Sequence, residues 1–332
     1  MVKHMSSIDL HLPEVALKIK AKGARRVALQ LPEGLKVRAL EASAYLSAET
    51  GAEVMVLGDA CFGACDVDAS ALRYVDVLVH FGHAAMPVLE CSDNVIFQEV
   101  RLPMDIEVGL ERVLPLLQGR VGLITAVQHL DCLEQARAYL EARGFAVLMG
   151  KGDGRIRWPG QVLGCNISGP QEISGEVDCF LFIGTGNFHP LAVAIGTRKR
   201  VVRLDPYTQE AEELGELHER IMRQRFGVIT AATRAKTFLI LVSSKVGQDR
   251  MPLARELAER IRVQGKQAWI MVMGEFRPEA LLAYQVDAYV NTACPRIAID
   301  DQARYGKPML TPVELEIVLG ERAWEDYRMD VI

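Results

Sequence analysis

The stretch Gly58-Asp59-Ala60-Cys61-Phe62-Gly63-Ala64-Cys65-Asp66-Val67-Asp68 is the part of the chain that decides its fold. It follows the apolar run Val54-Met55-Val56-Leu57, which is typical of a buried parallel strand, and its glycines mark the turn at which such a strand ends. Open α/β sheets bind their ligands in loops at the carboxyl ends of parallel strands. The sequence therefore predicts a ligand-binding loop over residues 58–68.

Two other cysteines lie in similar loops. Cys165 follows Trp158-Pro159-Gly160-Gln161-Val162-Leu163-Gly164, and Cys294 lies in Val290-Asn291-Thr292-Ala293-Cys294-Pro295-Arg296. We expect Cys65, Cys165 and Cys294 to meet at one site. Small buried cysteines are common in α/β cores, and three others are assigned to ordinary packing: Cys91, Cys132 and Cys179.

The rest of the chain repeats one plan. An apolar strand, a helix ended by glycine and further short strands recur three times, beginning at Val27–Leu31, Val121–Ile124 and Phe238–Val242. The predicted fold is therefore α/β, with three related parallel-sheet α/β domains arranged about a pseudo-threefold axis and a central cluster site. The three units are placed at residues 6–103 with Cys65, 104–210 with Cys165, and 211–332 with Cys294. A helix is also expected around Ala69 to Tyr74, and a long helix over about Ala211 to Arg225.

Composition limits the class of protein. The chain has 332 residues, 50% hydrophobic and 24% charged, which is typical of a globular protein with two or three domains. No apolar run reaches the roughly 18 residues of a membrane span, and the N-terminus lacks the apolar segment of a signal peptide, so we expect a cytoplasmic protein without membrane contact. A net charge of −5 argues against a nucleic-acid surface, and seven scattered cysteines argue against a disulfide framework.

Three cysteines at one centre suit an iron-sulfur cluster with an open position. Full ligation of a [4Fe-4S] cluster takes four cysteines, so three would leave one iron available to a substrate. The loop that holds Cys61 and Cys65 resembles the start of a Cys-x-x-x-Cys-x-x-Cys motif, but its third position is Asp68. A carboxylate suits such a cluster poorly, so one loop cannot supply all the ligands. We expect Cys61 to be a free thiol beside the site.

Five segments carry a resemblance to a known family. They resemble the diphthamide synthase family, whose archaeal members are 2-(3-amino-3-carboxypropyl)histidine synthases, over most of the length from Val27 to about Gly320. The segments are Phe62-Gly63-Ala64-Cys65-Asp66, Trp158 to Asn166, Gly184-Thr185-Gly186-Asn187-Phe188-His189-Pro190-Leu191, Leu204-Asp205-Pro206-Tyr207-Thr208 and Ala293-Cys294-Pro295-Arg296.

The resemblance implies a cofactor and a reaction. It implies a homodimer of three-domain subunits, each with a [4Fe-4S] cluster on three cysteines that match Cys65, Cys165 and Cys294. S-adenosylmethionine would bind the open iron, and one electron from the reduced cluster would break the bond from sulfur to the γ-carbon of methionine. The resulting 3-amino-3-carboxypropyl radical would add to C2 of a histidine on translation elongation factor 2, with release of methylthioadenosine. An electron donor is also implied.

Several strand-end residues are candidates for contacts with S-adenosylmethionine. Their backbone N–H groups could hold a nucleoside or a carboxylate, although ordinary turn chemistry explains them as well. They are Gly184, Thr185, Gly186, Ser243, Ser244, Lys245, Gly247 and Gln248, with three acidic residues, Glu33, Asp59 and Asp205, as further contacts.

Four histidines lie at strand ends near the expected centre, where a base for the C2 proton or a donor to a carboxylate is needed. A structural role is the ordinary explanation for any one of them. They are His80, His83, His129 and His189. We assign the catalytic role to His189, because it lies in the glycine-rich loop.

Two alternatives stay open at this stage. Quinolinate synthase has a similar plan of three related domains around a [4Fe-4S] centre, but its substrates are small metabolites, so cleavage of S-adenosylmethionine separates the two functions. The other alternative is a non-catalytic electron-transfer subunit, in which a cluster would form without cleaving S-adenosylmethionine.

Overall fold

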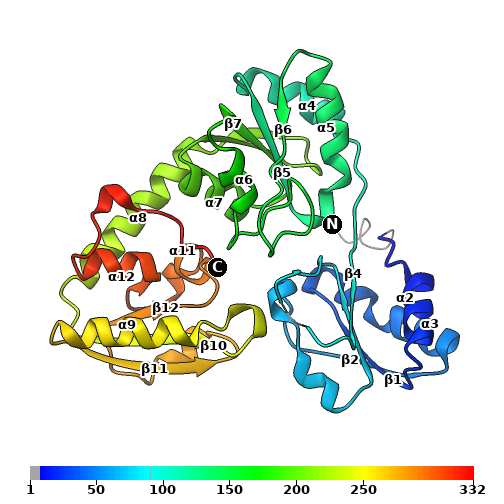
Figure 1. Ribbon diagram of the computed structural model, residues 1–332, viewed down its shortest axis with the longest axis horizontal. Helices are drawn as coiled ribbons and strands as arrows, with labels where there is room; N and C mark the ends of the chain where they lie inside the picture. The colour runs from blue at the N-terminus through cyan, green and yellow to red at the C-terminus, as the bar shows by residue number, and fades with distance from the viewer. Residues whose placement is uncertain (1–7, 90) are drawn as a thin grey trace.

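Three separate β-sheets organise the chain. The computed structural model describes residues 8–89 and 91–332, and the sheets have four, five and four strands. Figure 1 shows three lobes at the corners of a triangle, with the C-terminus close to its middle. The predicted α/β class is confirmed. Residues 6 and 7, with which the first predicted unit begins, lie outside the described residues.

The first sheet is entirely parallel, with strand order β2-β1-β3-β4. Its central strands are apolar and buried, as expected when both faces are covered. The predicted helix around Ala69 is instead a short 3-10 turn. The elements are α2 (Leu12–Ala21), β1 (Arg26–Gln30), η1 (Glu33–Arg38), α3 (Ala39–Thr50), β2 (Glu53–Val56), η2 (Ala64–Asp66), η3 (Ala69–Arg73), β3 (Val77–Phe81) and β4 (Val95–Gln98).

The second sheet has order β6-β5-β7-β8-β9, with β9 antiparallel to β8 at its edge. This added strand holds residues 211–213, for which the sequence analysis predicted the start of a long helix; the helix begins at Gly215. The elements are α4 (Glu107–Val113), η4 (Leu114–Leu116), β5 (Val121–Thr125), η5 (Val127–His129), α5 (Asp131–Glu141), β6 (Val147–Leu148), α6 (Ser168–Ile173), β7 (Cys179–Ile183), α7 (Phe188–Thr197), β8 (Arg200–Leu204) and β9 (Ala211–Glu213).

The third sheet is again parallel, with order β11-β10-β12-β13. Helix α8 runs from the second sheet to the third (Figure 1). The elements are α8 (Gly215–Ala232), β10 (Thr237–Ser243), η6 (Val246–Gln248), α9 (Met251–Val263), β11 (Gln267–Met273), α10 (Pro278–Leu281), β12 (Ala288–Asn291), α11 (Arg296–Ile299), η7 (Gln302–Arg304), β13 (Met309–Leu310), α12 (Pro312–Val318) and η8 (Trp324–Asp326).

One aspartate recurs at the same place in every sheet. Asp76, Asp178 and Asp287 each directly precede the third strand of their sheet, and each carboxylate accepts a hydrogen bond from backbone N–H groups at the start of the first strand. The first four strands of each sheet also follow the same spatial order. This shared detail supports the interpretation of the chain as three related units.

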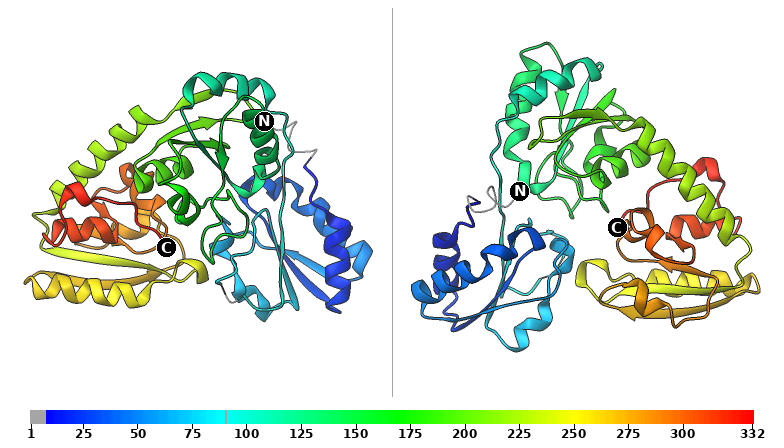
Figure 2. Two further views of the ribbon diagram at one scale, coloured as in Figure 1. Left: turned by 45° about the horizontal axis from the view of Figure 1, so that its top comes forward. Right: turned by 180° about the vertical axis from the view of Figure 1, so that it is seen from behind.

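The units do not pack equally. Buried side chains of the second and third sheets, including Phe180 and Phe238, belong to one continuous hydrophobic core around α7 and α8. The first sheet has its own core, built from residues such as Leu29 and Phe81. Both rear and tilted views show the first lobe beside the other two (Figure 2). Among the described residues no helix is long and apolar enough to cross a membrane.

Candidate functional site

A cavity lined by residues of all three units lies where the units meet. Its volume is about 480 Å³, and its lining includes Cys65 from the first unit, Cys165 from the second and Cys294 from the third. The three cysteines are separated by 100 residues or more in sequence, yet they share one cavity because each follows the carboxyl end of a strand in a related sheet. The prediction that they come together is confirmed.

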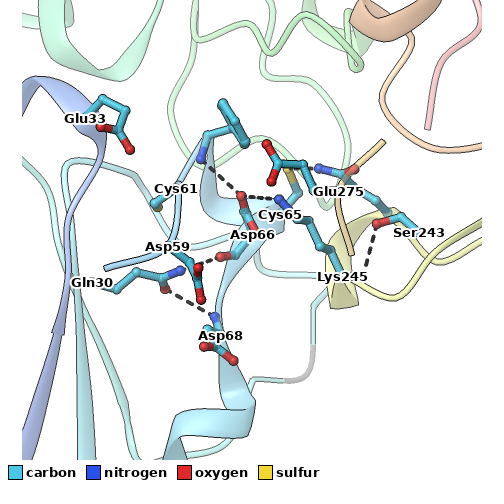
Figure 3. Close-up of polar contacts among 12 residues, drawn as sticks. Gln30, Glu33, Asp59, Cys61, Cys65, Asp66, Asp68, Ser243, Lys245 and Glu275 are labelled. Carbon is cyan, nitrogen blue, oxygen red and sulfur yellow. Dashed lines mark hydrogen bonds and ion pairs between the residues drawn. The ribbon is translucent and has the colours of Figure 1, made fainter. Parts of the chain in front are cut away.

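The loop around Cys65 is held by side chains of its own unit. The carboxylate of Asp66 accepts a hydrogen bond from the backbone N–H of Phe62, at 3.2 Å. The side-chain amide of Gln30, at the end of β1, donates to the carbonyl of Asp66 at 2.7 Å and accepts from the N–H of Asp68 at 3.2 Å (Figure 3). Gln30 therefore fixes the segment that directly follows Cys65.

The third unit also contacts the loop that carries Cys65. Lys245 Nζ lies 2.7 Å from the Asp66 carboxylate, and the Gln248 amide donates to Cys65 Sγ at 3.2 Å (Figure 3 draws the lysine). Gly247 comes so close that a Cβ built there would lie 2.4 Å from the Cα of Cys65. Only glycine fits at position 247 without a shift of the backbone. The loop of the third unit therefore packs directly against the backbone of Cys65 in the first unit.

Cys165 and Cys294 are fixed by local backbone contacts. The carbonyl of Cys165 accepts a hydrogen bond from the N–H of Ile332 at 2.8 Å, and a Cβ at the neighbouring Gly164 would lie 1.9 Å from the ring of Phe188. The side-chain amide of Asn291, at the end of β12, donates to the carbonyl of Cys294 at 2.8 Å. Each cysteine is therefore held in a defined loop.

The thiols influence each other electrostatically. Burial raises the pKa of Cys165 well above its usual value, and the neighbouring Cys294 and Cys65 raise it further. Burial also raises the pKa of Cys294 to about 12 and raises that of Cys65. Three thiols in this environment stay protonated until a cation replaces their protons, so they are suited to metal binding rather than to exposed thiol reactivity.

The surroundings fit an iron-sulfur cluster. Three cysteine thiols are the donor set that such clusters use, with a fourth position left over. In the part of the chain that the structure describes, Arg155 Nε is buried without a hydrogen-bond partner, although another nitrogen of its guanidinium donates to the carbonyl of Gly247. The Arg155 charge lowers the pKa of Cys65 and of Cys165 against the effect of burial. A cation with a buried, unused donor atom beside Cys65 and Cys165 matches a negatively charged group bound at the cysteines.

His189 lines the same cavity, close to the cysteines. Its ring stacks on Phe182 at 6.0 Å between centroids and meets Phe188 edge-on. Burial lowers the pKa of His189 to about 4, with a further contribution from Arg296. The histidine is therefore uncharged at neutral pH, as a proton acceptor must be.

Only some of the residues predicted to contact S-adenosylmethionine line the cavity. Among the residues described as lining the cavity are Ser243, Lys245 and Gln248, whereas five other predicted contacts are absent from that lining: Gly184, Thr185, Gly186, Ser244 and Gly247. Ser244 and the tip of the glycine-rich loop, Thr185 and Gly186, are exposed. The role of these eight residues stays a prediction.

Cys61 has a different environment from the other cysteines of the site. It is buried, its pKa is raised to about 12 mainly by burial, and it has no disulfide partner among the described residues. Its Sγ lies 4.0 Å from His80 Nε2, and with His83 the three potential donor atoms fall within 4.8 Å of one another. Cys61 does not line the cavity with Cys65 in the described structure.

The other predicted side chains have mostly structural surroundings. Asp68 caps the turn η3 by accepting from the N–H of Ser70, and Asp205 accepts from two N–H groups of its own turn. Cys132 and Cys179 are buried and Cys91 is half-buried, so none of the three lines the cavity in the described chain.

Sequence reasoning missed several cavity residues. Gln161 lies in a loop whose only sequence signal was the nearby cysteine, and Arg277, Arg296 and Arg304 come from short turns of the third unit. Arg155, in the same loop as Gln161, affects the pKa of Cys65 and of Cys165 without being one of the residues described as lining the cavity. Arg296 directly follows the predicted Cys294-Pro295 turn, so its position next to that loop was the one available signal. Two of these arginines are paired with carboxylates that also line the cavity, Arg277 with Glu275 and Arg304 with Asp301.

Comparisons with known proteins agree with this geometry. The family model for diphthamide synthesis proteins matches residues 31–328. A 2-(3-amino-3-carboxypropyl)histidine synthase of Pyrococcus horikoshii is 39% identical, with 96% of this chain and 92% of the relative covered. Subunit 1 of the human 2-(3-amino-3-carboxypropyl)histidine synthase is 30% identical, with 98% of this chain and 75% of the relative covered.

The fold is similar to that of a solved structure. A crystal structure of Dph2 from Pyrococcus horikoshii with a 4Fe-4S cluster superposes with a TM-score of 0.90 at 37% identity, and the match covers 98% of this chain and 94% of the other. With a family match over most of its length and a relative of this similarity, the chain belongs to the diphthamide synthesis protein family.

Proposed function

We propose that this chain is a 2-(3-amino-3-carboxypropyl)histidine synthase that acts in the first step of diphthamide synthesis. It transfers a 3-amino-3-carboxypropyl group from S-adenosylmethionine to C2 of a histidine on translation elongation factor 2. The observation that carries the proposal is the convergence of Cys65, Cys165 and Cys294, one from each unit, on one cavity in a member of this family.

The three cysteines are the residues that would hold a [4Fe-4S] cluster. When bound, the cluster supplies one electron for breaking the bond between sulfur and the γ-carbon of methionine. The protein's part is to fix the distance and direction between substrate and cluster, because only the correctly aligned bond accepts the electron. The loop contacts of Gln30, Gln248 and Asn291 serve that purpose by immobilising the cysteines.

The remaining cavity residues bind and orient S-adenosylmethionine. Ser243, Lys245 and Gln248 offer hydrogen-bond donors on one side, and Arg296 offers a cation for the methionine carboxylate. The apolar side chains of Phe62 and Phe188 limit the access of water to a reactive substrate. The other predicted contacts, Gly184, Thr185, Gly186, Ser244 and Gly247, belong to the same proposal, with Gly247 acting through the position of Cys65.

His189 is the proposed catalytic base. It faces the cavity and its pKa is lowered to about 4, mainly by burial, so its ring is neutral at physiological pH and has a free nitrogen lone pair. A neutral imidazole can take the proton from C2 of the modified histidine once the radical adduct has also given up one electron, for which the oxidised cluster would be the acceptor.

Partners follow from the reaction. Translation elongation factor 2 is the proposed protein substrate, a reductant or electron-donor protein reduces the cluster, and two copies of the chain form a homodimer in the cytoplasm. The three units are proposed to end near residues 103, 210 and 332, although β9 extends the second sheet to Glu213.

The decisive experiment is anaerobic. The protein is reconstituted with iron and sulfide, reduced with dithionite and mixed with S-adenosylmethionine and elongation factor 2, and the products are identified by mass. Methylthioadenosine together with a histidine heavier by one 3-amino-3-carboxypropyl group is the expected result. Deoxyadenosine would contradict the proposed bond cleavage, and an intact cluster with no product would favour a cluster enzyme for small metabolites or an electron-transfer subunit.

A further inference from the structure

A chain of hydrogen bonds runs from the Cys65 loop to the cavity. Gln30 Oε1 lies 2.8 Å from His80 Nδ1, and His80 Nε2 lies 2.9 Å from His83 Nδ1. Gln30 and His80 are buried, and His83 lines the cavity beside the apolar side chains of Ala84 and Met86. Gln30 and His80 lie near the carboxyl ends of β1 and β3. The three side chains therefore connect these strand ends with the cavity that the cysteines line.

The direction of every hydrogen bond in this chain is determined. The Gln30 amide nitrogen donates to the carbonyl of Asp66, and its oxygen accepts from the N–H of Asp68, so Oε1 is an acceptor toward His80 as well. His80 must then carry its proton on Nδ1, which leaves Nε2 with a lone pair in the neutral ring. His83 consequently donates from Nδ1, and its own Nε2 is the atom without a proton.

The free nitrogen of His83 is left for a ligand. Nδ1 and Nε2 of an imidazole flank Cε1 and point in divergent directions, so the Nε2 of a ring that donates from Nδ1 to His80 points away from His80. No hydrogen bond among the described residues uses this atom. Burial lowers the pKa of His83 to about 4, which keeps Nε2 an acceptor at neutral pH. A hydrogen-bond acceptor held by a relay at a cavity wall fits a ligand that carries an N–H.

We propose that His83 binds the ring of the substrate histidine by accepting a hydrogen bond from its imidazole N–H. Both ring nitrogens adjoin C2, so this contact fixes the tautomer of the acceptor ring and turns C2 toward the cysteines. The neighbouring apolar wall of Ala84, Met86 and Val127 suits a flat, uncharged ring. The inference rests on the proposed function, since it names the part of the cavity that receives the protein substrate.

The relay also explains the Cys61, His80 and His83 cluster without a metal ion. Two of the three donor atoms, His80 Nε2 and His83 Nδ1, already share a proton in a 2.9 Å hydrogen bond. A metal would have to displace that proton and break the relay. The hydrogen bonds of the described residues therefore favour the substrate-binding interpretation.

The test separates cleavage of S-adenosylmethionine from transfer to protein. In the cluster-loaded enzyme, His83→Phe is expected to form methylthioadenosine from S-adenosylmethionine at the normal rate, while kcat/KM for elongation factor 2 falls about tenfold, as for the loss of one hydrogen bond. His83→Gln, whose Oε1 can accept the same hydrogen bond, is expected to recover part of the transfer. His218→Phe on α8, away from the cavity, is the control.

Two measurements keep the result interpretable. Cluster content and thermal unfolding of the His83→Phe protein are compared with those of the His218→Phe control, so that a folding defect is recognised. The inference would be overturned if methylthioadenosine formation and transfer to protein fell in parallel in both His83 variants while their cluster content stayed intact. His83 would then be needed for the reaction of S-adenosylmethionine and not for binding the substrate histidine. Unchanged transfer in His83→Phe would overturn it as well. Absence of transfer in the unmodified enzyme would instead refute the proposed function, and with it a subsite for histidine.

Discussion

Two buried polar regions of this protein differ in how completely their groups are paired. In the third unit, Arg225 and Glu314 are fully buried, and two nitrogens of the guanidinium contact the two carboxylate oxygens at 2.6 to 2.7 Å. The same guanidinium donates to the carbonyls of Ala298 and Met309, and Tyr327 donates to Glu314. Beside Cys65 and Cys165, by contrast, Arg155 Nε has no hydrogen-bond partner among the described residues.

This difference in hydrogen bonding distinguishes buried polar groups that stabilise the fold from those that are available to a ligand. A buried ion pair is tolerated when every donor and acceptor is used, and then it fixes one arrangement of the elements that it joins. The Arg225 network connects α8 with α11, β13 and α12, so it holds the linking helix on the third unit. A buried polar group without a hydrogen-bond partner destabilises the folded protein. Such a group is expected where a bound ligand supplies the missing hydrogen bond.

The largest effect on stability is expected from the paired region. Arg225→Ala leaves the Glu314 carboxylate buried without its cation, and we expect the free energy of unfolding to fall by about 3–5 kcal/mol. Urea denaturation of the cluster-free chain, followed by circular dichroism, measures this. A loss below about 1 kcal/mol would show that the network can relax, and would weaken its contrast with the cavity.

Gly247 tests how closely the third unit constrains Cys65. An alanine there would place its Cβ 2.4 Å from the Cα of Cys65, so the loop has to move. A displacement of about 1 Å at a reacting centre can reduce the rate about 10²-fold, and we expect Gly247→Ala to lose methylthioadenosine formation to that degree. Gly227→Ala on α8 is the control, because a Cβ there would meet no described atom within 4 Å and Gly227 does not line the cavity in the described chain. Equal activities of the two variants would contradict the close coupling.

Lys245 gives an intermediate case between the two regions. Its contact with Asp66 is 2.7 Å long but remains partly accessible to solvent, with 17% of the lysine side chain exposed. Burial raises the pKa of Asp66 although Lys245 lowers it. The lysine therefore offsets only part of the cost of burying the Asp66 carboxylate. Lys245→Met is expected to lower the free energy of unfolding by about 2 kcal/mol, less than Arg225→Ala. Chemical denaturation of both variants under the same conditions checks the order.

The smallest effect concerns pH. The pKa of His189 is lowered by burial to about 4, against about 6.5 in an unfolded chain, so its contribution to stability is fully present above pH 6.5 and is lost as the pH falls toward 4. At pH 5.5 we expect this histidine to cost the cluster-free protein about 1 kcal/mol, and His189→Gln to remove that part of the pH dependence. An identical pH profile for the variant would show that His189 is already accessible to protons.

The sequence predicted the cysteines and the repeat because both have local signals. Glycine and proline mark the loops of Cys65, Cys165 and Cys294, and apolar runs mark the strands. The start of α8 was placed too early, since residues 211–213 pair with β8, and that pairing depends on a partner that no local pattern identifies.

The relay of Gln30, His80 and His83 and the position of Arg155 could not be predicted in the same way. His80 and His83 were recognised only as strand-end histidines, because the hydrogen bond of His80 to Gln30 joins residues 50 positions apart. Arg155 lies 90 positions from Cys65, whose pKa its charge lowers, and this proximity results from the packing of whole units. Contacts that depend on the relative position of domains have no signature in a single sequence.

The central claim is that three cysteines, one from each unit, hold one cluster. The most direct measurement is the iron and sulfide content of the anaerobically reconstituted chain and of its single cysteine variants. We predict one [4Fe-4S] cluster per chain, severe loss of bound iron in Cys65→Ala, Cys165→Ala and Cys294→Ala, and full content in Cys132→Ala. Full iron content in any of the first three variants, or severe loss in Cys61→Ala, would contradict the account.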